Sequence, residues 1–338
     1  MIKLPEIFLL EEGRIRNEVA RCKASRVLIQ LPEGLRPAVH RIASIVEEAG
    51  ALAIVSADPC YGACDLALNE AQILSADLLI HFGHSESNLF DHPSNLPVIF
   101  VEAKAQVDVR GAVEDALRYL DDWEKIGLAT VVQHADSLSE AKEILERAGK
   151  KVYIGREAGL KHPGQVLGCN YKNAKSIRDS VDAFLIIGSG LFHAVGLFLA
   201  TLKPTVAADP FEGRAIRVDD KAKTVINKRW MDIREASDAR RWGVIIGLKS
   251  GQLNFEVALK VKGDLEAHGR RAMLLAIREI TPEILGGFPQ IEAYVNTACP
   301  RISLCETRKF SRPVLTPREM HVALGDLEWE EYLRAGIL

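Results

Sequence analysis

One pattern occurs three times along this chain of 338 residues, and it limits the possible fold more than any other feature. Each copy consists of a short apolar strand, a loop, an amphipathic helix and three further apolar strands. The helices of the three copies end at Gly50, Gly149 and Gly269. Glycine is common just beyond a helix because it adopts the left-handed backbone that stops one. Near-continuous apolar strands are typical of parallel sheets with helices on both faces. The pattern predicts an α/β fold of three homologous small domains, each a four-stranded parallel sheet flanked by helices.

The expected strands can be placed from their β-branched and apolar runs. They lie at 26–30, 51–58, 77–85 and 97–103 in the first copy, 125–133, 151–157, 183–190 and 204–210 in the second, and 241–249, 271–280, 292–300 and 313–319 in the third. The predicted domains are 1–104, 105–210 and 211–338. One large doubly wound sheet is the alternative, and the recurring glycines argue against it.

The composition excludes several classes of partner. Lys and Arg together number 43 against 46 Asp and Glu, which gives a net charge of −3 and no field that would hold a nucleic acid. No apolar run reaches the roughly 18 residues of a membrane span. The first 20 residues lack the basic start and long apolar run of a signal peptide. We therefore expect a cytoplasmic protein that binds neither membrane nor nucleic acid.

Open parallel sheets bind ligands at the carboxyl ends of their strands, and small residues are frequent in the loops expected there. These loops contain no Walker A sequence, and no G-x-G-x-x-G follows a strand, so neither nucleotide-binding fingerprint is present.

Cysteines occur in these loops in all three copies. They are Cys60 and Cys64 in the first, Cys169 in the second and Cys299 in the third. In a reducing compartment such thiols are more often metal-binding or catalytic than paired in disulfides. Three converging thiolates suit an iron–sulfur cluster, or zinc with one open position. The absence of C-x-x-C weakens the zinc alternative.

The other cysteines are less informative. Cys22 and Cys305 are expected to be small apolar side chains. Cys60 and Cys64 form C-x-x-x-C, but Ala67 stands where the common radical S-adenosylmethionine motif has its third cysteine.

Five motifs, in this order, resemble one enzyme family. They are YGACD (61–65), GQVLGCNY (164–171), IIGSGLFHAVGL (186–197), TACPRIS (297–303) and RPVLTPREM (312–320). Together they are similar to the archaeal diphthamide biosynthesis enzymes, the 2-(3-amino-3-carboxypropyl)histidine synthases. The resemblance implies three domains around a pseudo-threefold axis and a 4Fe-4S cluster held by Cys64, Cys169 and Cys299. It gives Cys60 no counterpart, so Cys60 is expected to be a bystander thiol near the cluster.

The same resemblance implies the reaction. S-adenosylmethionine binds the open iron, and its bond from sulfur to the methionine γ-carbon is cleaved reductively. The products are 5′-methylthioadenosine and a 3-amino-3-carboxypropyl radical, which attaches to C2 of a histidine imidazole on translation elongation factor 2. A homodimer and an unidentified electron donor are expected.

Candidate contacts to S-adenosylmethionine lie in the strand-end loops. Gln252 matches a Gly-Gln of the family, Ser189 and Gly190 can offer backbone N–H groups to a carboxylate, and His193 is either a contact or a core residue. His81 and His84 have the same two interpretations.

Two alternatives to this function remain. Quinolinate synthase is similar in having three α/β repeats with one cluster cysteine each, and it acts on a small molecule. A non-catalytic partner subunit is the other alternative, although such a subunit could dispense with the three cysteines that are present here.

Overall fold

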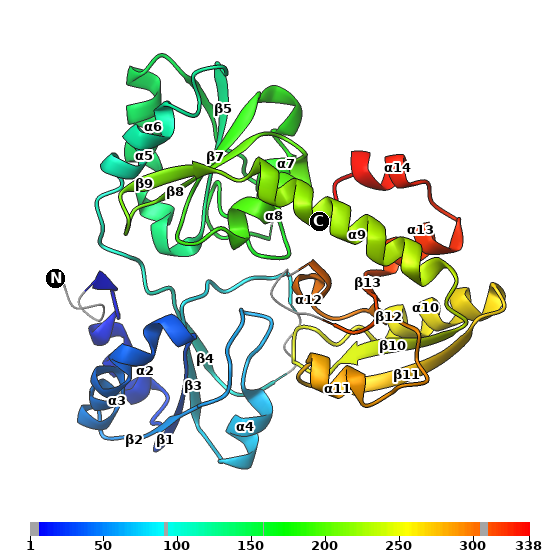
Figure 1. Cartoon of the computed structure of the whole chain (residues 1–338). Coiled ribbons are helices and arrows are strands. Elements are labelled where there is room, and N and C mark those ends of the chain that lie inside the picture. The colour runs from blue at the N-terminus through cyan, green and yellow to red at the C-terminus, as the bar shows by residue number, and fades with distance from the viewer. Residues whose placement is uncertain (1–6, 91–93, 158, 305–309) are drawn as a thin grey trace. The chain divides into compact units, whose positions relative to one another are not determined.

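The computed structural model describes residues 7–90, 94–157, 159–304 and 310–338. The chain forms two compact units, which are described separately. Unit 1 comprises Met1–Val166, Lys172–Ser189 and Ala207–Ile216, and unit 2 comprises Leu167–Tyr171, Gly190–Val206 and Arg217–Leu338. Figure 1 shows three sheets with their helices. Because the sheets are separate, the alternative of one large doubly wound sheet is wrong.

The first sheet has four parallel strands in the order β2-β1-β3-β4. Their bounds are β1 Arg26–Gln30, β2 Leu52–Val55, β3 Leu78–Phe82 and β4 Val98–Val101. The accompanying helices are α2 (Glu12–Arg21), η1 (Glu33–Ala38), α3 (Val39–Glu48) and α4 (Leu68–Ile73).

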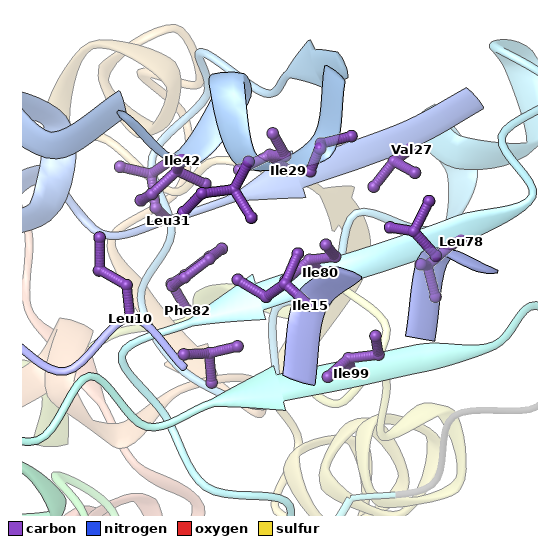
Figure 2. Close-up of a cluster of buried hydrophobic side chains, with 14 of the residues drawn as sticks. Leu10, Ile15, Val27, Ile29, Leu31, Ile42, Leu78, Ile80, Phe82 and Ile99 are labelled. Atoms are coloured by element: carbon purple, nitrogen blue, oxygen red, sulfur yellow. The ribbon is translucent and has the colours of Figure 1, made fainter. Parts of the chain in front are cut away.

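Alternate strand residues point to opposite faces of this sheet, and on both faces they are apolar. Helices therefore cover both faces. Ile29 and Ile80 pack with Ile15 of α2 and Ile42 of α3 on one face, as Figure 2 shows. The other face is formed by a smaller cluster, which contains Leu28, Leu79, Leu66, Ala67 and Ala71. The loops at the strand ends are therefore held by a core on each side.

The second sheet has five strands in the order β6-β5-β7-β8-β9. Their bounds are β5 Lys125–Thr130, β6 Lys151–Tyr153, β7 Ala183–Ile187, β8 Thr205–Asp209 and β9 Arg214–Arg217. Its helices are α5 (Arg110–Leu117), η2 (Val132–Ser137), α6 (Leu138–Arg147), α7 (Lys172–Lys175) and η3 (Arg178–Ser180). The prediction of four strands is wrong for this sheet. A short turn at 210–213, in which Gly213 takes a φ of 62°, returns the chain and adds β9 at the edge.

The third sheet has the order β11-β10-β12-β13 and lies in unit 2. Its strands are β10 Arg241–Gly247, β11 Arg271–Ile277, β12 Ala293–Asn296 and β13 Val314–Leu315. The helices of unit 2 are α8 (Phe192–Thr201), α9 (Asp219–Ser237), α10 (Phe255–Ala267), α11 (Pro282–Gly286), α12 (Pro300–Leu304), α13 (Pro317–Leu324) and α14 (Trp329–Arg334). Among the helices that the structure describes, none is long and apolar enough to cross a lipid bilayer.

The three sheets share one design. In each, the first strand pairs with the second on one side and the third on the other. Gly50, Gly149 and Gly269 follow the equivalent helices with left-handed φ values of 89°, 82° and 70°. The prediction of three homologous α/β domains is confirmed. The boundaries after 104 and 210 stay predictions, and β9 lies beyond the second of them.

A repeated acidic residue also marks this design. Asp77, Asp182 and Glu292 each directly precede the third strand of their sheet. Each carboxylate accepts two backbone N–H bonds from the start of the first strand, at distances between 2.7 and 3.2 Å. These bonds lower the pKa of Asp77, and they lower that of Glu292 to about 2, helped by the Arg241 side chain. We call Asp77, Asp182 and Glu292 the acid clips.

A buried ion pair joins α9 to α13 in unit 2. The Arg229 guanidinium donates to both carboxylate oxygens of Glu319 at 2.8 Å, and both side chains are buried. Arg229 also donates to the carbonyls of Ser303 and Val314. Burial alone would raise the pKa of Glu319, but the charge and hydrogen bonds of Arg229 outweigh it and the pKa is lowered. The pair thus fixes α12 and β13, the elements that follow Cys299.

Candidate functional site

Cys299 lies at the carboxyl end of β12, in a loop that one buried amide holds. The Asn296 side chain donates to the carbonyl of Cys299 at 2.7 Å and accepts from the N–H of Ala298 at 3.0 Å. The Thr297 hydroxyl donates to the carbonyl of Ile245, at the end of the neighbouring strand β10, at 2.7 Å. The thiol of Cys299 is half-buried. The backbone of this loop is therefore fixed while its thiol stays partly accessible, as a metal ligand requires.

Gln252 is placed in the loop after β10, beside the Cys299 loop. Its backbone N–H donates to the carbonyl of Lys249 at 2.9 Å, and its side chain is buried. A Cβ atom added to Gly247 would lie 2.5 Å from the Cβ of Ala298 and 3.2 Å from the carbonyl oxygen of Gln252. Only glycine therefore lets the two loops approach this closely. The structure brings Gln252 and Cys299 to one edge of the third sheet.

Cys169 lies at the tip of a tight turn in unit 2. Leu167 and Asn170 exchange backbone hydrogen bonds of 2.9 and 3.2 Å across this turn. A Cβ on Gly168 would lie 2.6 Å from the ring of Phe192 and 3.1 Å from Cδ of Arg301. Arg301 belongs to α12, which begins directly after Cys299. The turn of Cys169 and the loop of Cys299 therefore converge within unit 2.

The turn of Cys169 is packed against Phe192 and Arg301, and His193 follows Phe192 in the chain. The Arg301 guanidinium lies 3.7 Å from the centre of the Phe192 ring, and the His193 ring is edge-on to Phe192 at 5.1 Å. Gly190 precedes them with a left-handed φ of 71°. Burial, and then the charge of Cys169, raises the pKa of Tyr171. Of the candidate contacts, Gly190, His193 and Gln252 share unit 2 with the two cysteines.

Ser189 belongs to unit 1, where it lines a cavity of about 420 Å³. Its hydroxyl donates to Asp209 at 3.3 Å, and the N–H of Phe211 donates to the same carboxylate oxygen at 3.0 Å. The apolar walls include Leu35 and Phe211. A carboxylate at this position suits a cationic ligand group better than the anionic one expected from the loop sequence.

Cys64 lies in unit 1, in the loop between β2 and α4, and its thiol is half-buried. Gln30, at the end of β1, holds the segment that follows it. The Gln30 amide donates to the carbonyl of Asp65 at 2.6 Å and accepts from the N–H of Ala67 at 3.1 Å. Sequence reasoning missed Gln30, although a polar residue ending an otherwise apolar strand was a usable signal. It also missed Asn296 and Arg301.

The donor set fits an iron–sulfur cluster. Three cysteines, each half-buried and each in a strand-end loop, offer the thiolates that such clusters require. Two of them converge within unit 2, and the third lies in unit 1. Their common centre stays a prediction. Cys22 is partly buried against the first core, in line with its expected apolar role, and Cys305 lies outside the described residues.

Comparison with known proteins gives consistent matches along the chain. A family model described as a diphthamide synthesis protein matches residues 31–333. The chain belongs to the diphthamide synthesis family. A relative from Pyrococcus horikoshii, 2-(3-amino-3-carboxypropyl)histidine synthase, is 40% identical over 96% of this chain and 94% of its own length. Subunit 1 of that synthase from Gallus gallus is 30% identical over 97% of this chain and 80% of its own length.

Solved structures from the family agree. The crystal structure of Dph2 from Pyrococcus horikoshii with a 4Fe-4S cluster is similar with a TM-score of 0.87 and 40% identity. The match covers 98% of this chain and 95% of that one. The predicted family is confirmed, and the match decides against the quinolinate synthase alternative.

Proposed function

We propose that this chain is a 2-(3-amino-3-carboxypropyl)histidine synthase, which catalyses the first step of diphthamide biosynthesis. It transfers the 3-amino-3-carboxypropyl group of S-adenosylmethionine to C2 of a histidine imidazole on translation elongation factor 2. The observation that carries the proposal is the match to the synthase from Pyrococcus horikoshii, which is 40% identical over 96% of this chain. The convergence of the Cys169 and Cys299 loops supports it.

Cys64, Cys169 and Cys299 would hold a 4Fe-4S cluster. Bound there, the cluster supplies an electron and an iron position open to S-adenosylmethionine. Cleavage of the bond from sulfur to the γ-carbon then releases 5′-methylthioadenosine and a 3-amino-3-carboxypropyl radical. The chain's own task is to orient the sulfonium so that this carbon is the one attacked, and to keep water from the radical.

The loops around the cysteines provide groups for this orientation. The buried amide of Gln252 can donate to or accept from the methionine part of the substrate. Gly190, with its left-handed φ, can present its N–H to the carboxylate, and His193, whose ring packs edge-on against Phe192, is the second candidate contact. Asp209, held by Ser189 and the N–H of Phe211, suits the amine or sulfonium charge. Gln252, Gly190 and His193 belong to unit 2 together with Cys169 and Cys299, and Asp209 belongs to unit 1.

The protein substrate and the assembly complete the proposal. Translation elongation factor 2 is the acceptor, an external reductant supplies the electron, and the enzyme works as a homodimer in the cytoplasm. A net charge of −3 is compatible with a protein acceptor and gives no attraction to naked nucleic acid.

The test is an anaerobic reaction of the iron-reconstituted chain with dithionite, S-adenosylmethionine and elongation factor 2. We expect release of 5′-methylthioadenosine and one modified histidine, identified by mass spectrometry of the factor. Release of 5′-deoxyadenosine, or an unmodified factor, would contradict the proposal. Omission of dithionite is the control and should leave both products absent.

A further inference from the structure

The first domain contains a second set of metal-ligating side chains. The ligand atoms of Cys60, His81 and His84 all lie within 4.8 Å of one another. Cys60 comes from the loop after β2, His81 from β3 itself and His84 from the turn that follows β3. Cys60 is 8% exposed and His81 is fully buried.

Gln30 fixes which nitrogen of His81 can bind a metal. The Gln30 amide is oriented by two backbone groups, because its NH₂ donates to the carbonyl of Asp65 and its oxygen accepts from the N–H of Ala67. That oxygen lies 2.9 Å from Nδ1 of His81. An amide oxygen only accepts, so Nδ1 of His81 carries the proton. The lone pair of His81 is therefore on Nε2, which faces His84.

His84 is held against this lone pair by the turn. Gly83 has a left-handed φ of 82°, and a Cβ there would lie 2.8 Å from Pro32. The turn brings Nδ1 of His84 to 2.9 Å from Nε2 of His81, so the ring of His84 donates to that of His81. A tetrahedral ion with metal–nitrogen bonds of about 2.0–2.1 Å separates its two nitrogens by about 3.3 Å. If the two rings moved apart by a few tenths of an ångström, both nitrogens could bind one ion.

We propose that Cys60, His81 and His84 form a mononuclear site for a zinc-class divalent metal ion. One thiolate and two imidazoles are a donor set typical of zinc, and three protein ligands leave a fourth position open. Gln30 supplies the outer hydrogen bond that orients a metal-bound histidine. On binding, Cys60 loses its thiol proton to solvent, and the proton of His84 moves from Nδ1 to Nε2. The site is separate from the proposed cluster ligands and does not depend on the proposed transferase activity.

The experiment counts zinc and iron in the purified, cluster-containing full chain by mass spectrometry after gel filtration. We expect about one zinc ion per chain in addition to the iron. Cys60→Ser and His84→Asn should each lower zinc to near zero while the iron content and its visible absorption remain. The matched controls are Cys22→Ser and His40→Asn in the same domain, which should retain both metals.

Cobalt titration provides a second measurement. A background variant in which Cys64, Cys169 and Cys299 are all serine removes the proposed cluster ligands, so that Co²⁺ alone probes the remaining site. We expect a near-ultraviolet thiolate-to-cobalt absorption that Cys60→Ser abolishes. Gln30→Met should weaken Co²⁺ binding about ten- to a hundred-fold, the usual effect of losing an outer hydrogen bond.

Three results would overturn the proposal. Zinc that is absent from the wild-type chain, or unchanged in Cys60→Ser, would exclude the site. Loss of iron in Cys60→Ser would instead make Cys60 a cluster ligand. Cobalt that binds the background variant without thiolate absorption would exclude Cys60 as a ligand. None of these readouts requires 5′-methylthioadenosine release, so failure of the proposed transferase reaction would be seen separately.

Discussion

At the scale of single residues, the side-chain amides of two buried residues hold the loops that carry the candidate metal ligands. Gln30 connects the segment after Cys64 to His81, and Asn296 closes the loop that carries Cys299. Each amide uses its donor and its acceptor on fixed backbone groups. Because a buried backbone group left without a partner is costly, such residues fix the backbone of the loops that carry the thiols.

Replacing Gln30 tests this role. Gln30→Met keeps the volume but leaves the N–H of Ala67 and the carbonyl of Asp65 without their side-chain partner. We expect the free energy of unfolding to fall by about 1–3 kcal/mol, measured by urea denaturation of the metal-free chain. Gln72→Met, on the exposed side of α4, is the control and should change stability little. Equal stability of Gln30→Met and wild type would contradict the structural role.

The three proposed cluster ligands allow an equally direct test. Cys64→Ser, Cys169→Ser and Cys299→Ser should each remove most of the iron and its visible absorption after anaerobic reconstitution, because each takes away one thiolate. Iron and sulfide assays measure this, and Cys22→Ser should retain full iron content. Retention of iron in any one of the three would remove that residue from the ligand set.

At the scale of elements, close approach between loops depends on individual glycines. Gly247→Ala places a Cβ 2.5 Å from Ala298, so either the Gln252 loop or the Cys299 loop must shift. We expect a loss of about 1–3 kcal/mol in stability, as for other overpacked sites, together with reduced iron retention. Denaturation and iron assays on the purified variant measure both.

Gly263→Ala is a matched control for that substitution. Gly263 lies within α10 and an added Cβ would meet nothing within 4 Å. Alanine should therefore stabilise the helix by up to about 1 kcal/mol. If both alanines gave the same change, the close approach at Gly247 would not limit the loops.

The ion pair between α9 and α13 is another element-scale contact. Arg229→Met leaves Glu319 buried without its cation, and we expect a loss of about 3–5 kcal/mol in chemical denaturation. The exposed pair of Arg147 and Glu143 on α6 is the comparison, and Arg147→Met should cost less than about 0.5 kcal/mol. Similar costs for the two arginines would contradict the structural role of the buried pair.

Glu292, the acid clip of the third domain, predicts that the stability of the fold depends on pH. Its folded-state pKa of about 2 lies below the ordinary value, so Glu292 stabilises the fold above the unfolded pKa and loses this effect as pH falls towards about 2. Glu292→Gln should therefore reduce stability at neutral pH and flatten its decline in acid, measured by circular dichroism from neutral pH to pH 2. Glu256→Gln, on the surface of α10, should keep the wild-type profile.

At the scale of the whole molecule, the three sheets were largely predictable and the site was only partly so. The repeat, the strand positions and the terminating glycines follow from local sequence, because periodicity and backbone preference act over a few residues. The edge strand β9 was missed because it has only four residues, of which Ala215 alone is buried. The roles of Gln30 and Arg301, and the short distance between His81 and Cys60, arise from contacts between segments that are far apart in the sequence. No local sequence pattern predicts such contacts.

A ligand bound by residues of both units should couple their unfolding. Cys64 belongs to unit 1, whereas Cys169 and Cys299 belong to unit 2. We expect anaerobic calorimetry to show separate or broadened transitions for the metal-free chain, and a sharper transition at higher temperature when iron is bound. Identical thermograms would argue against a cluster shared between the units.

The acid clips lie at the amino ends of the strands, whereas the cysteine loops follow carboxyl ends. Each domain therefore separates the residues that hold it together from those that are free to diverge after gene duplication. This explains how one ancestral unit could keep its scaffold in triplicate while its three sets of loops became different. The repetition also allows an internal comparison, because the same substitution can be made at the equivalent residues Asp77 and Asp182 of one chain.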